Sequence, residues 1–323
     1  MLMSIQDVSK LIVGGRRLAI AGDEALLSKL PRGNWIGGTT AYFMTEKGGV
    51  VTKEHMFVHD LTDSSTGGSI KRYSVADLPN IAKDAPERGF SIIIIPAFSE
   101  AHFAYAQNAP NYEGIFMKPI VGWISGVHLD DLGKVAPKVF NGETGAFAEN
   151  DAMVFHFTIA NDKDATIHIL NLFEQGNGDT ITFEEEGFAV HDCFINGEKQ
   201  SVHDYIKNNN IDTKLPLVAD YCGAHVNVSY QGIRPSDGAV MLYAPVFKDV
   251  KYKIAAPVSD PASAFKRIAP KDPTPPTFAC NCVLNFLYLG LEGKTIGNLN
   301  GPITFGEIAY QLVNQTRVSL EVK

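Results

Sequence analysis

The sequence is poor in cysteine and tryptophan and has no long apolar run. Its 323 residues include 4 Cys and 2 Trp. Four thiols in a chain of this length are too few for a disulfide scaffold, so we expect free thiols in a reducing compartment. The longest purely aliphatic run, residues 92–95, is far shorter than a membrane span and predicts a buried strand. A membrane is therefore not an expected partner.

An excess of basic residues is also absent. Lys and Arg number 28 against 36 Asp and Glu, which gives a formal net charge of −8, and the basic residues are scattered along the chain. Nucleic acids and anionic lipids are bound by clustered Lys and Arg, so we expect neither as a partner. Residues 1–10 lack the apolar segment and small-residue cleavage site of an export signal. A cytoplasmic location is the resulting expectation.

What the sequence does contain is enough apolar residues, 45%, to bury a large core. Strand-like runs outnumber helical ones, which predicts an α+β fold with mixed, mostly antiparallel β-sheets flanked by short helices. Short helices are expected at residues 24–30, before Pro31, and at residues 201–208. The runs 152–160 and 165–173 surround a cluster of turn residues and predict a hairpin.

The stretch GNWIGGTTAYFMTE, residues 33–46, combines paired glycines with paired threonines. It predicts a strand that closes at Ile36, a glycine turn at residues 37–38, and a second strand that turns again at residues 48–49. A phosphate-binding loop needs its glycines to open a helix, and no helix is expected here. Two interpretations stay open: a turn whose glycines serve packing alone, or a ligand site with the hydroxyls at 39–40.

A second glycine-bearing stretch, residues 115–128, looks like the first. An apolar strand is followed by Gly-Trp, by Ser-Gly and by a histidine. His156 and His168 lie inside other strand-like runs, where histidines more often pack and form hydrogen bonds than bind a metal. We therefore predict no metal site from these histidines.

Residues 256–277 hold six prolines. Proline removes amide donors and favours extended segments, so this region predicts a connection between subdomains. We expect two intimately packed subdomains: residues 1–255, with a possible internal break near 175–200, and residues 256–323.

The C-terminal segment predicts further elements. Residues 278–294 fit both a helical and a strand period, and the choice stays open. Thr304 and Glu307 have the spacing of a capping box, which predicts a helix over residues 307–313. Residues 316–322 alternate and predict a final strand.

Cys280 and Cys282 form a Cys-x-Cys pair within this segment. A zinc site would need a second pair of Cys or His at a suitable spacing, and a catalytic thiol would need an oriented base. The sequence shows neither, so no metal site and no catalytic residue is assigned.

The succession of these segments resembles the FIST sensory domain of bacterial and archaeal signalling proteins. Residues 36–41 are similar to the family's G-C-[ST]-T-x-G turn, and residues 139–157 resemble its loop and following strand. INGEKQSVHDYI with LPLV, GPITFGEIA and NQT resemble its C-terminal pattern, whereas Tyr42 stands where the family's turn has its second glycine. The resemblance spans nearly the whole chain, and GEI followed by NQT is its most specific element.

The resemblance implies a sensory protein that binds an amino acid or similar small metabolite in a pocket between the subdomains and signals through a separate partner. No cofactor is expected, although some relatives bind haem, for which His128 or His225 would be the ligand here. Thr39 and Thr40 would bond the ligand, and Glu307 would either pair with a ligand cation or only cap its helix. The expected ligand-binding residues are Gly37, Gly38, Thr39, Thr40, Tyr42, Trp123, His128, Cys280, Asn281, Cys282, Asn285, Phe305 and Glu307.

Two other functions remain open. The chain could be an enzyme that uses the same cleft, either a hydrolase or a thiol-dependent catalyst with Cys280 or Cys282 beside a histidine. A catalyst needs an activated nucleophile, so a shifted thiol pKa would distinguish it from a binding protein. The chain could also be a structural or partner-binding protein, which a closed cavity without convergent polar atoms would favour.

Overall fold

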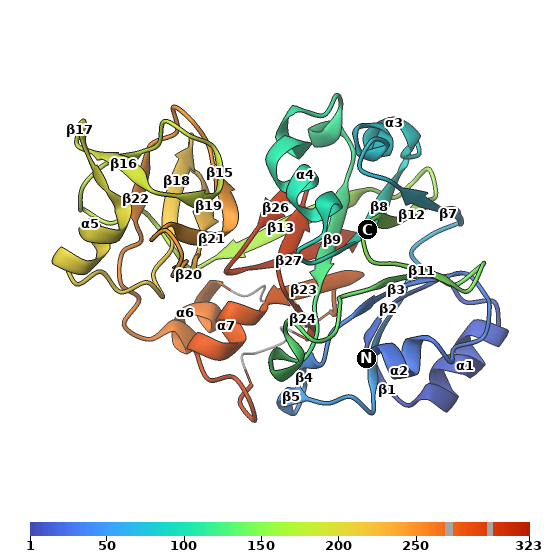
Figure 1. The fold of residues 1–323 in the computed structure, drawn as a ribbon. Helices are drawn as coiled ribbons and strands as arrows, with labels where there is room; N and C mark the ends of the chain where they lie inside the picture. Colours follow the sequence, from blue (N-terminus) through green and yellow to red (C-terminus); the bar gives the residue numbers. More distant parts are fainter. Residues whose placement is uncertain (269–273, 296–299) are drawn as a thin grey trace. The chain divides into compact units, whose positions relative to one another are not determined.

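The computed structural model describes residues 1–268, 274–295 and 300–323. The chain divides into two compact units (Figure 1). Unit 1 comprises Met1–Leu170, Lys266–Leu312 and Arg317–Lys323, and unit 2 comprises Asn171–Phe265 and Val313–Thr316. The expected α+β fold, with mixed, mostly antiparallel sheets and short helices, is confirmed. The units have other bounds than the expected division at residue 256, because residues 266–312 belong to unit 1. Part of the proline-rich segment, residues 269–273, lies outside the described residues.

Unit 1 contains one arrangement three times: a strand, a short helix and a second strand that pairs in parallel with the first. The parallel strands end at the same edge of their sheet, which places the following loops together. The three sets are β2 (Leu18–Gly22), α2 (Glu24–Leu27) and β3 (Trp35–Thr39); β8 (Gly89–Pro96), α4 (Glu100–Asn108) and β9 (Ile120–Ser125); and β23 (Phe278–Cys282), α7 (Val283–Tyr288) and β24 (Gly301–Thr304).

Each repeat then sends two strands into the sheet of a neighbouring repeat. The first joins β4 (Tyr42–Thr45) and β5 (Gly48–Val51) to β24, the second joins β10 (Val139–Asn141) and β11 (Ala146–Ala148) to β3, and the third joins β25 (Glu307–Ala309) and β26 (Gln311–Val313) to β9. The exchange is cyclic, so each sheet is completed by strands of another repeat. The repeats are therefore interlocked, and none of them has a sheet made only of its own strands.

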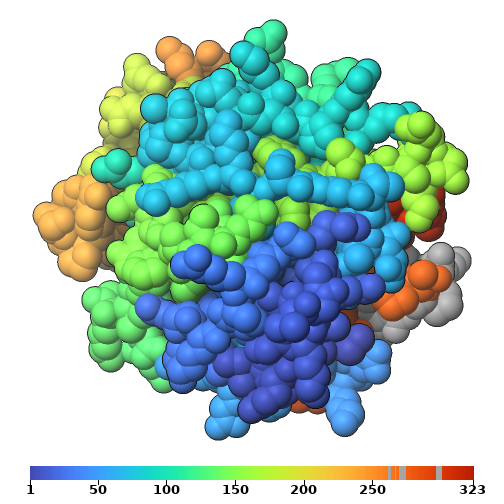
Figure 2. Space-filling view, turned by 90° about the vertical axis from the view of Figure 1, so that its right-hand side faces the viewer, coloured from blue at the N-terminus to red at the C-terminus, as the bar shows by residue number. Residues whose placement is uncertain are grey.

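The last strand of each repeat returns to pair antiparallel with its own first strand. These strands are β6 (Met56–Asp60) beside β2, β12 (Ala152–Thr158) beside β8 and β27 (Thr316–Val322) beside β23. The outer edges are β1 (Leu2–Met3), β7 (Gly67–Tyr73) and β13 (Ala165–Asn171), which complete three six-stranded sheets. The remaining helices described in unit 1 are α1 (Ile5–Val13), α3 (Ile81–Asp84) and four short 3₁₀ helices, whereas α6 (Pro261–Ile268) begins in unit 2 and ends in unit 1. In Figure 2, blue atoms of the N-terminal repeat border the green atoms near residues 140–150, as the pairing of β10 with β3 requires.

Strand β8 forms the predicted buried core of the second sheet. Residues 92–95 are fully buried, and β12 and β9 pair with this strand on both sides. In the first two repeats the helix after the first strand begins at a side-chain cap: Asp23 Oδ1 accepts a hydrogen bond from the Ala25 amide at 2.8 Å, and Ser99 Oγ accepts one from the His102 backbone amide at 3.0 Å. Such caps satisfy amides that the first helical turn leaves unpaired.

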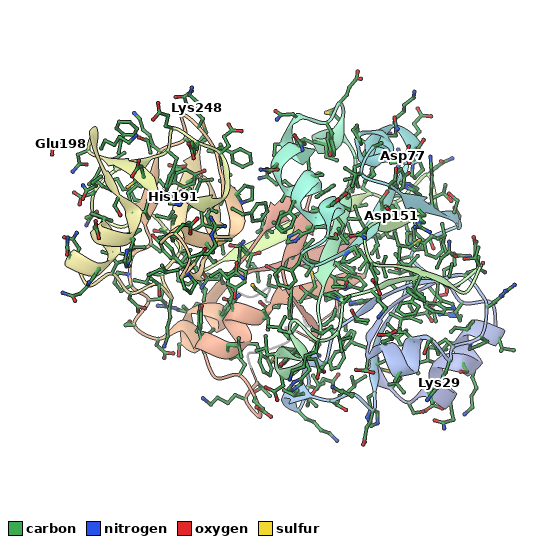
Figure 3. All side chains as sticks on the ribbon, viewed as in Figure 1. Lys29, Asp77, Asp151, His191, Glu198 and Lys248 are labelled. Carbon is green, nitrogen blue, oxygen red and sulfur yellow. The ribbon has the colours of Figure 1, made fainter. Side chains whose placement is uncertain are left out.

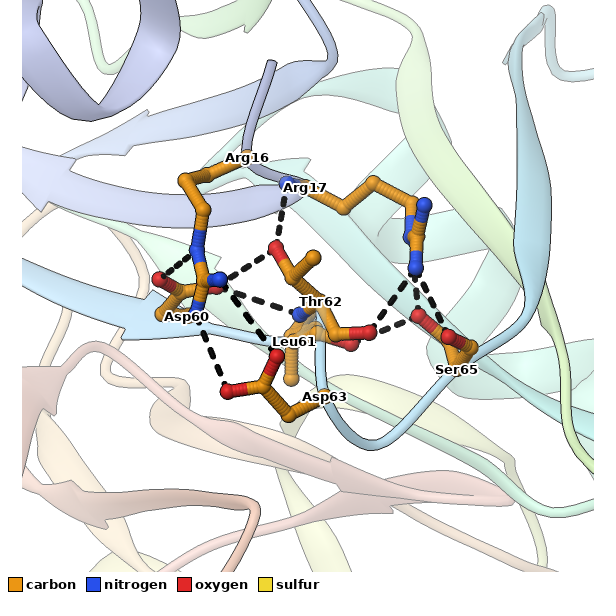
Figure 4. Close-up of polar contacts among 7 residues, drawn as sticks. All are labelled: Arg16, Arg17, Asp60, Leu61, Thr62, Asp63 and Ser65. Carbon is orange, nitrogen blue, oxygen red and sulfur yellow. Dashed lines mark hydrogen bonds and ion pairs between the residues drawn. The ribbon is translucent and has the colours of Figure 1, made fainter. Parts of the chain in front are cut away.

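A polar network ties the start of β2 to the turn after β6 (Figure 4). The Arg16 guanidinium contacts Asp60 at 2.6 Å and Asp63 at 3.1 Å. Arg17 donates to Ser65 Oγ at 2.9 Å and to the Thr62 carbonyl oxygen at 2.8 Å. Charge-assisted bonds to one turn fix where β6 ends beside β2.

Unit 2 is built from one six-stranded and one three-stranded sheet. Ser201 caps α5 (Val202–Asn208) by accepting from the Asp204 amide at 3.2 Å, which confirms the helix predicted at 201–208. The side-chain Nδ2 of Asn227 donates to Asn171 Oδ1 and to the Asn314 carbonyl oxygen, which anchors residues 313–316 in this unit. The strands are β14 (Ile181–Thr182), β15 (Gly187–Val190), β16 (Asp192–Ile195), β17 (Glu198–Ser201), β18 (Leu217–Tyr221), β19 (Ala224–Val228), β20 (Tyr230–Ile233), β21 (Val240–Val246) and β22 (Tyr252–Ile254).

Several local predictions were wrong. Runs 152–160 and 165–173 do not form a hairpin, because β12 pairs with β7 and β8 whereas β13 joins the sheet of β27. The hairpin after the paired threonines turns at residues 46–47, and the glycines at 48–49 lie in β5. Residues 307–313 form strands β25 and β26, since pairing with β9 overrides the helical spacing.

Other C-terminal predictions agree with the structure. Residues 278–294 use both periods in succession, strand β23 and then helix α7, and residues 316–322 form the predicted final strand β27. Charged side chains such as Lys29 and Asp77 in unit 1, and Glu198 and Lys248 in unit 2, are exposed (Figure 3). Within the described residues, no helix is long and apolar enough to cross a bilayer.

Candidate functional site

The ends of the three second strands meet in unit 1. Thr40 Oγ1 donates to the Ile303 carbonyl oxygen at 2.7 Å, which joins the first repeat to the third. The Gly126 amide donates to the Thr39 carbonyl oxygen at 2.8 Å, which joins the second repeat to the first. The third repeat reaches the second through the Phe305 amide, which donates to the Ile124 carbonyl oxygen at 3.0 Å. Carboxyl ends of parallel strands are where ligands bind in many α/β proteins.

A cleft of about 470 Å³ opens at this position. Three of the predicted site residues, Thr39, Thr40 and His128, line it. The other walls come from the start of α2, from the segment before β6 and from the segment after β9. The lining residues are Asp23, Glu24, Ala25, Ser28, Thr39, Thr40, Lys53, Gly126, Val127, His128, Asp131 and Val135.

The cleft carries charges of both signs. Lys53 Nζ lies 2.5 Å from Asp131 Oδ2. This hydrogen bond raises the pKa of Lys53 and lowers the pKa of Asp131. Glu24 pairs with Lys138, whose Nζ donates to Oε2 at 2.7 Å. Asp23, Glu24 and Asp131 contribute three carboxylates to the lining, against one ammonium group from Lys53. The cleft therefore offers partners to a cation as well as to a carboxylate.

Tyr42 supports the wall that contains His128. Their rings stack with centroids 5.6 Å apart and an interplanar angle of 18°, and Phe286 meets Tyr42 edge-on at 5.7 Å. The Tyr42 hydroxyl accepts a hydrogen bond from the Leu129 amide at 3.0 Å. Burial raises the pKa of Tyr42, so the hydroxyl stays protonated. Tyr42 thus positions the wall, although we predicted it as a ligand contact.

The paired glycines do not form the predicted turn, because Gly37 and Gly38 both lie within strand β3. A Cβ on Gly38 would lie 2.6 Å from Ile94 Cγ2 and 2.9 Å from Trp123 Nε1, and one on Gly37 would lie 3.0 Å from the Trp35 ring. Glycine is therefore required by close packing of the strand. Neither glycine lines the cleft.

A buried polar centre adjoins the cleft and shares Thr40 with its lining. The second strands run into the hydroxyl side chains of Thr40, Ser125 and Thr304, which are 1%, 0% and 0% exposed. Glu307 is fully buried and lies directly opposite Trp123 in the β25–β9 pairing. Thr304 Oγ1 lies 3.4 Å from Glu307 Oε1. Glu307 therefore caps no helix, and a fully buried carboxylate of this kind needs polar neighbours.

The predicted residues of β23 and α7 also lie in this interior and do not line the cleft. The Cys280 thiol donates to the Gly122 carbonyl oxygen at 3.3 Å. Burial and the charge of Glu307 raise the pKa of Cys280 well above its usual range. Asn281 Oδ1 accepts from the Cys282 amide at 2.8 Å and from Asn285 Nδ2 at 3.0 Å, which fixes the strand-to-helix junction.

A single family model matches almost the whole chain. The chain belongs to a family of unknown function, DUF6976. The model of that family matches residues 3–323. Searches of curated proteins and of solved structures gave no match. Membership in DUF6976 covers both units and names no activity.

The cleft of this DUF6976 chain contains residues that the sequence did not indicate. The position of Asp23 was indicated by the sequence only in part, since an Asp directly before the predicted helix at 24–30 is typical of an N-cap. Lys53 and Asp131 had none, because they come from connections of two different repeats. Among the described residues, no group of three or more His, Cys, Asp and Glu side chains is arranged to hold a metal ion.

Proposed function

We propose that the protein binds a small polar metabolite, such as an amino acid, in the cleft at the ends of β3 and β9. The observation that carries this proposal is the cleft itself, where three interlocked repeats bring strand ends together. Its volume of about 470 Å³ is in the usual range for small-molecule sites. The polar lining is pre-positioned by strands and by the Tyr42–His128 stack, which favours binding without large rearrangement.

The charge distribution suits a zwitterion. A ligand ammonium would find Asp23 and Asp131, and a ligand carboxylate would find Lys53. The ion pair between Lys53 and Asp131 is partly exposed, so it exchanges for ligand contacts at little cost in stability. A zwitterion can replace that pair charge for charge.

The resemblance to the FIST family supports a sensory role in the cytoplasm. In this proposal the bound metabolite changes the loops that line the cleft, and a separate signalling protein recognises the change. The loop at residues 128–135 is the natural reporter, because it forms one wall and leads directly into β10 of the neighbouring sheet.

The thiol-dependent enzyme is not favoured by the site. Cys280 and Cys282 are each 1% exposed, and burial disfavours the thiolate of Cys280. Neither thiol lines the cleft. A binding function accounts for the same cleft without an activated nucleophile.

A thermal-shift screen of the full chain tests the proposal. The panel contains the proteinogenic amino acids, small carboxylates and haem, since a ligand that binds the native state raises the melting temperature. We expect at least one amino acid to raise it, and Lys53→Ala to reduce that shift. Lys248→Ala, an exposed lysine of unit 2, is the matched control and should leave the shift unchanged. A panel without a hit, or a hit that Lys53→Ala leaves intact, contradicts the proposal.

A further inference from the structure

One carboxylate in the cleft has no cation of its own. Asp23 lies between β2 and α2, is half-buried and lines the cleft. Its Oδ1 accepts a hydrogen bond from the Ala25 amide at 2.8 Å, and in the described part of the chain its carboxylate forms no ion pair. An amide donor is neutral, so the negative charge of Asp23 is not cancelled.

The other two carboxylates of the lining each face a lysine. Lys138 Nζ donates to Glu24 Oε2 at 2.7 Å and also lies 3.3 Å from Glu149 Oε1. Lys138 therefore has two carboxylates to itself, and its side chain is only 11% exposed. Asp131 is paired with Lys53. Lys53 is thus the one ammonium group in the lining that a ligand carboxylate can use.

Lys53 feels the charge of Asp23 as well as that of Asp131. The hydrogen bond to Asp131 is the main cause of the raised pKa of Lys53, and the negative charge of Asp23 raises it further. The two carboxylates therefore lie within electrostatic reach of the same ammonium group. In the free protein this single cation offsets both of them only in part.

The other charged groups near the cleft do not restore the balance. His128, which also belongs to the lining, has its Nδ1 3.6 Å from Asp130 Oδ2. Asp130 and Lys134 lie on the following loop outside the lining, and Lys134 Nζ donates to the Asp130 carbonyl oxygen at 2.9 Å. These two side chains carry opposite charges, so the excess negative charge in the cleft remains that of Asp23.

This charge balance selects the kind of amino acid. When a ligand carboxylate pairs with Lys53, both Asp23 and Asp131 lose the ammonium group that they shared. An amino acid with a neutral side chain brings one cationic group for two carboxylates, whereas lysine or arginine brings two. We propose that the cleft selects amino acids with a cationic side chain and that Asp23 binds the cationic group of that side chain. This inference rests on the proposed function and names the class of its ligand.

Calorimetric titration of the full chain with matched pairs of ligands tests the selection. Norleucine lacks only the side-chain ammonium of lysine, and citrulline is the uncharged counterpart of arginine. We expect lysine and arginine to bind about fivefold more tightly than these counterparts, which is the upper range for a partly exposed ion pair. The difference should shrink at high salt, which screens exposed charges. Glutamate, which adds a third carboxylate, should bind most weakly.

Asp23→Asn tests the assignment to this residue. The amide oxygen of Asn can accept the same bond from Ala25, so the cap and the melting temperature should be retained. We expect the variant to bind lysine no more tightly than norleucine. Asp162→Asn is the matched control, because it removes one negative charge at an exposed turn outside the lining and should keep the preference. A preference that survives in Asp23→Asn refutes the role of Asp23.

Two further outcomes separate this inference from the proposed function. If norleucine and citrulline bind the wild type as tightly as lysine and arginine, the selection is refuted while amino-acid binding stands. If no amino acid binds, the proposed function fails and this inference fails with it. Cadaverine, which is lysine without its carboxylate, should bind more weakly than lysine because it leaves Lys53 facing a cation. Equal binding of the two would contradict the exchange at Lys53.

Discussion

Phe305 lies directly over Gly126, so closely that a Cβ on the glycine would meet the phenyl ring at 2.2 Å. The two residues belong to different repeats, and each follows the end of a second strand. Phe98 meets the same ring edge-on at 6.3 Å. The Phe305 ring thus covers the backbone of Gly126 at the point where the third repeat contacts the second.

The contact predicts the effect of Gly126→Ala. The new methyl group must displace the Phe305 ring, because the clash involves Cγ and Cδ1 near the base of the ring and not only its tip. We expect a loss of about 1–3 kcal/mol in the free energy of unfolding, measured by urea denaturation. Gly178→Ala is the control, since nothing lies within 4 Å of its Cβ position, and it should be neutral. Equal stability of both variants would show that the ring moves freely.

Local chemistry predicted much of the secondary structure. The aliphatic run at 92–95 became a buried strand, Ser201 capped a helix, and residues 316–322 became strand β27, which lies between β13 and β23. In each case the signal lies within a few residues, as a period or a cap. The similarity of residues 33–46 and 115–128 was also visible, and the structure explains it as two copies of one repeat.

The cyclic exchange of strands could not be predicted from such signals. Tyr42 pairs with Ile303 across most of the chain, and no local pattern specifies that partner. Strand pairing also explains why the turn predicted at the glycines is wrong. Residues 37–38 have the sequence of a turn, but β10 and β2 pair with them on both sides and keep them in strand β3. Tertiary pairing overrides local propensity in strands.

The candidate site was predicted in part for the same reason. Thr39 and Thr40 follow a strand with bare glycines, and the structure places both of them in the lining of the cleft. Cys280 and Asn281 belong to β23, the first strand of the third repeat, and their side chains are buried in the interior. Lys53 and Asp131 meet only because loops of two repeats converge, which the sequence does not encode locally.

A hydrogen-bond chain around His156 predicts pH-dependent stability. Asp84 accepts from the Tyr73 hydroxyl at 2.9 Å, so Tyr73 accepts from His156 Nε2 at 2.8 Å, and Nδ1 accepts from Ser91. Burial lowers the pKa of His156 to about 4, from 6.5 in the unfolded chain. The unfolded state therefore binds the proton first as the pH falls. The stabilisation is complete above pH 6.5 and is lost toward pH 4, by about 3 kcal/mol for this group.

Urea denaturation at several pH values checks this sign. His156→Gln keeps polar partners for Ser91 and Tyr73 but cannot titrate, so its stability should fall less than that of the wild type between pH 6.5 and pH 4. His55→Gln, at an exposed position, should follow the wild type. Parallel curves for the wild type and His156→Gln would mean that the imidazole takes up its proton equally in both states.

Thiol labelling distinguishes a binding protein from a thiol-dependent enzyme. Cys222 is exposed, whereas Cys193, Cys280 and Cys282 are buried. Burial, with the charge of Asp192, raises the pKa of Cys193 to about 11, and the pKa of Cys280 is raised as well. Iodoacetamide acts on the exposed thiolate, so we expect native protein to be modified at Cys222 only, as read by peptide mass spectrometry. Cys222→Ser should then take up no label until urea exposes the other three thiols. Rapid native labelling of Cys280 would instead connect the cleft to an activated thiol and favour the enzyme.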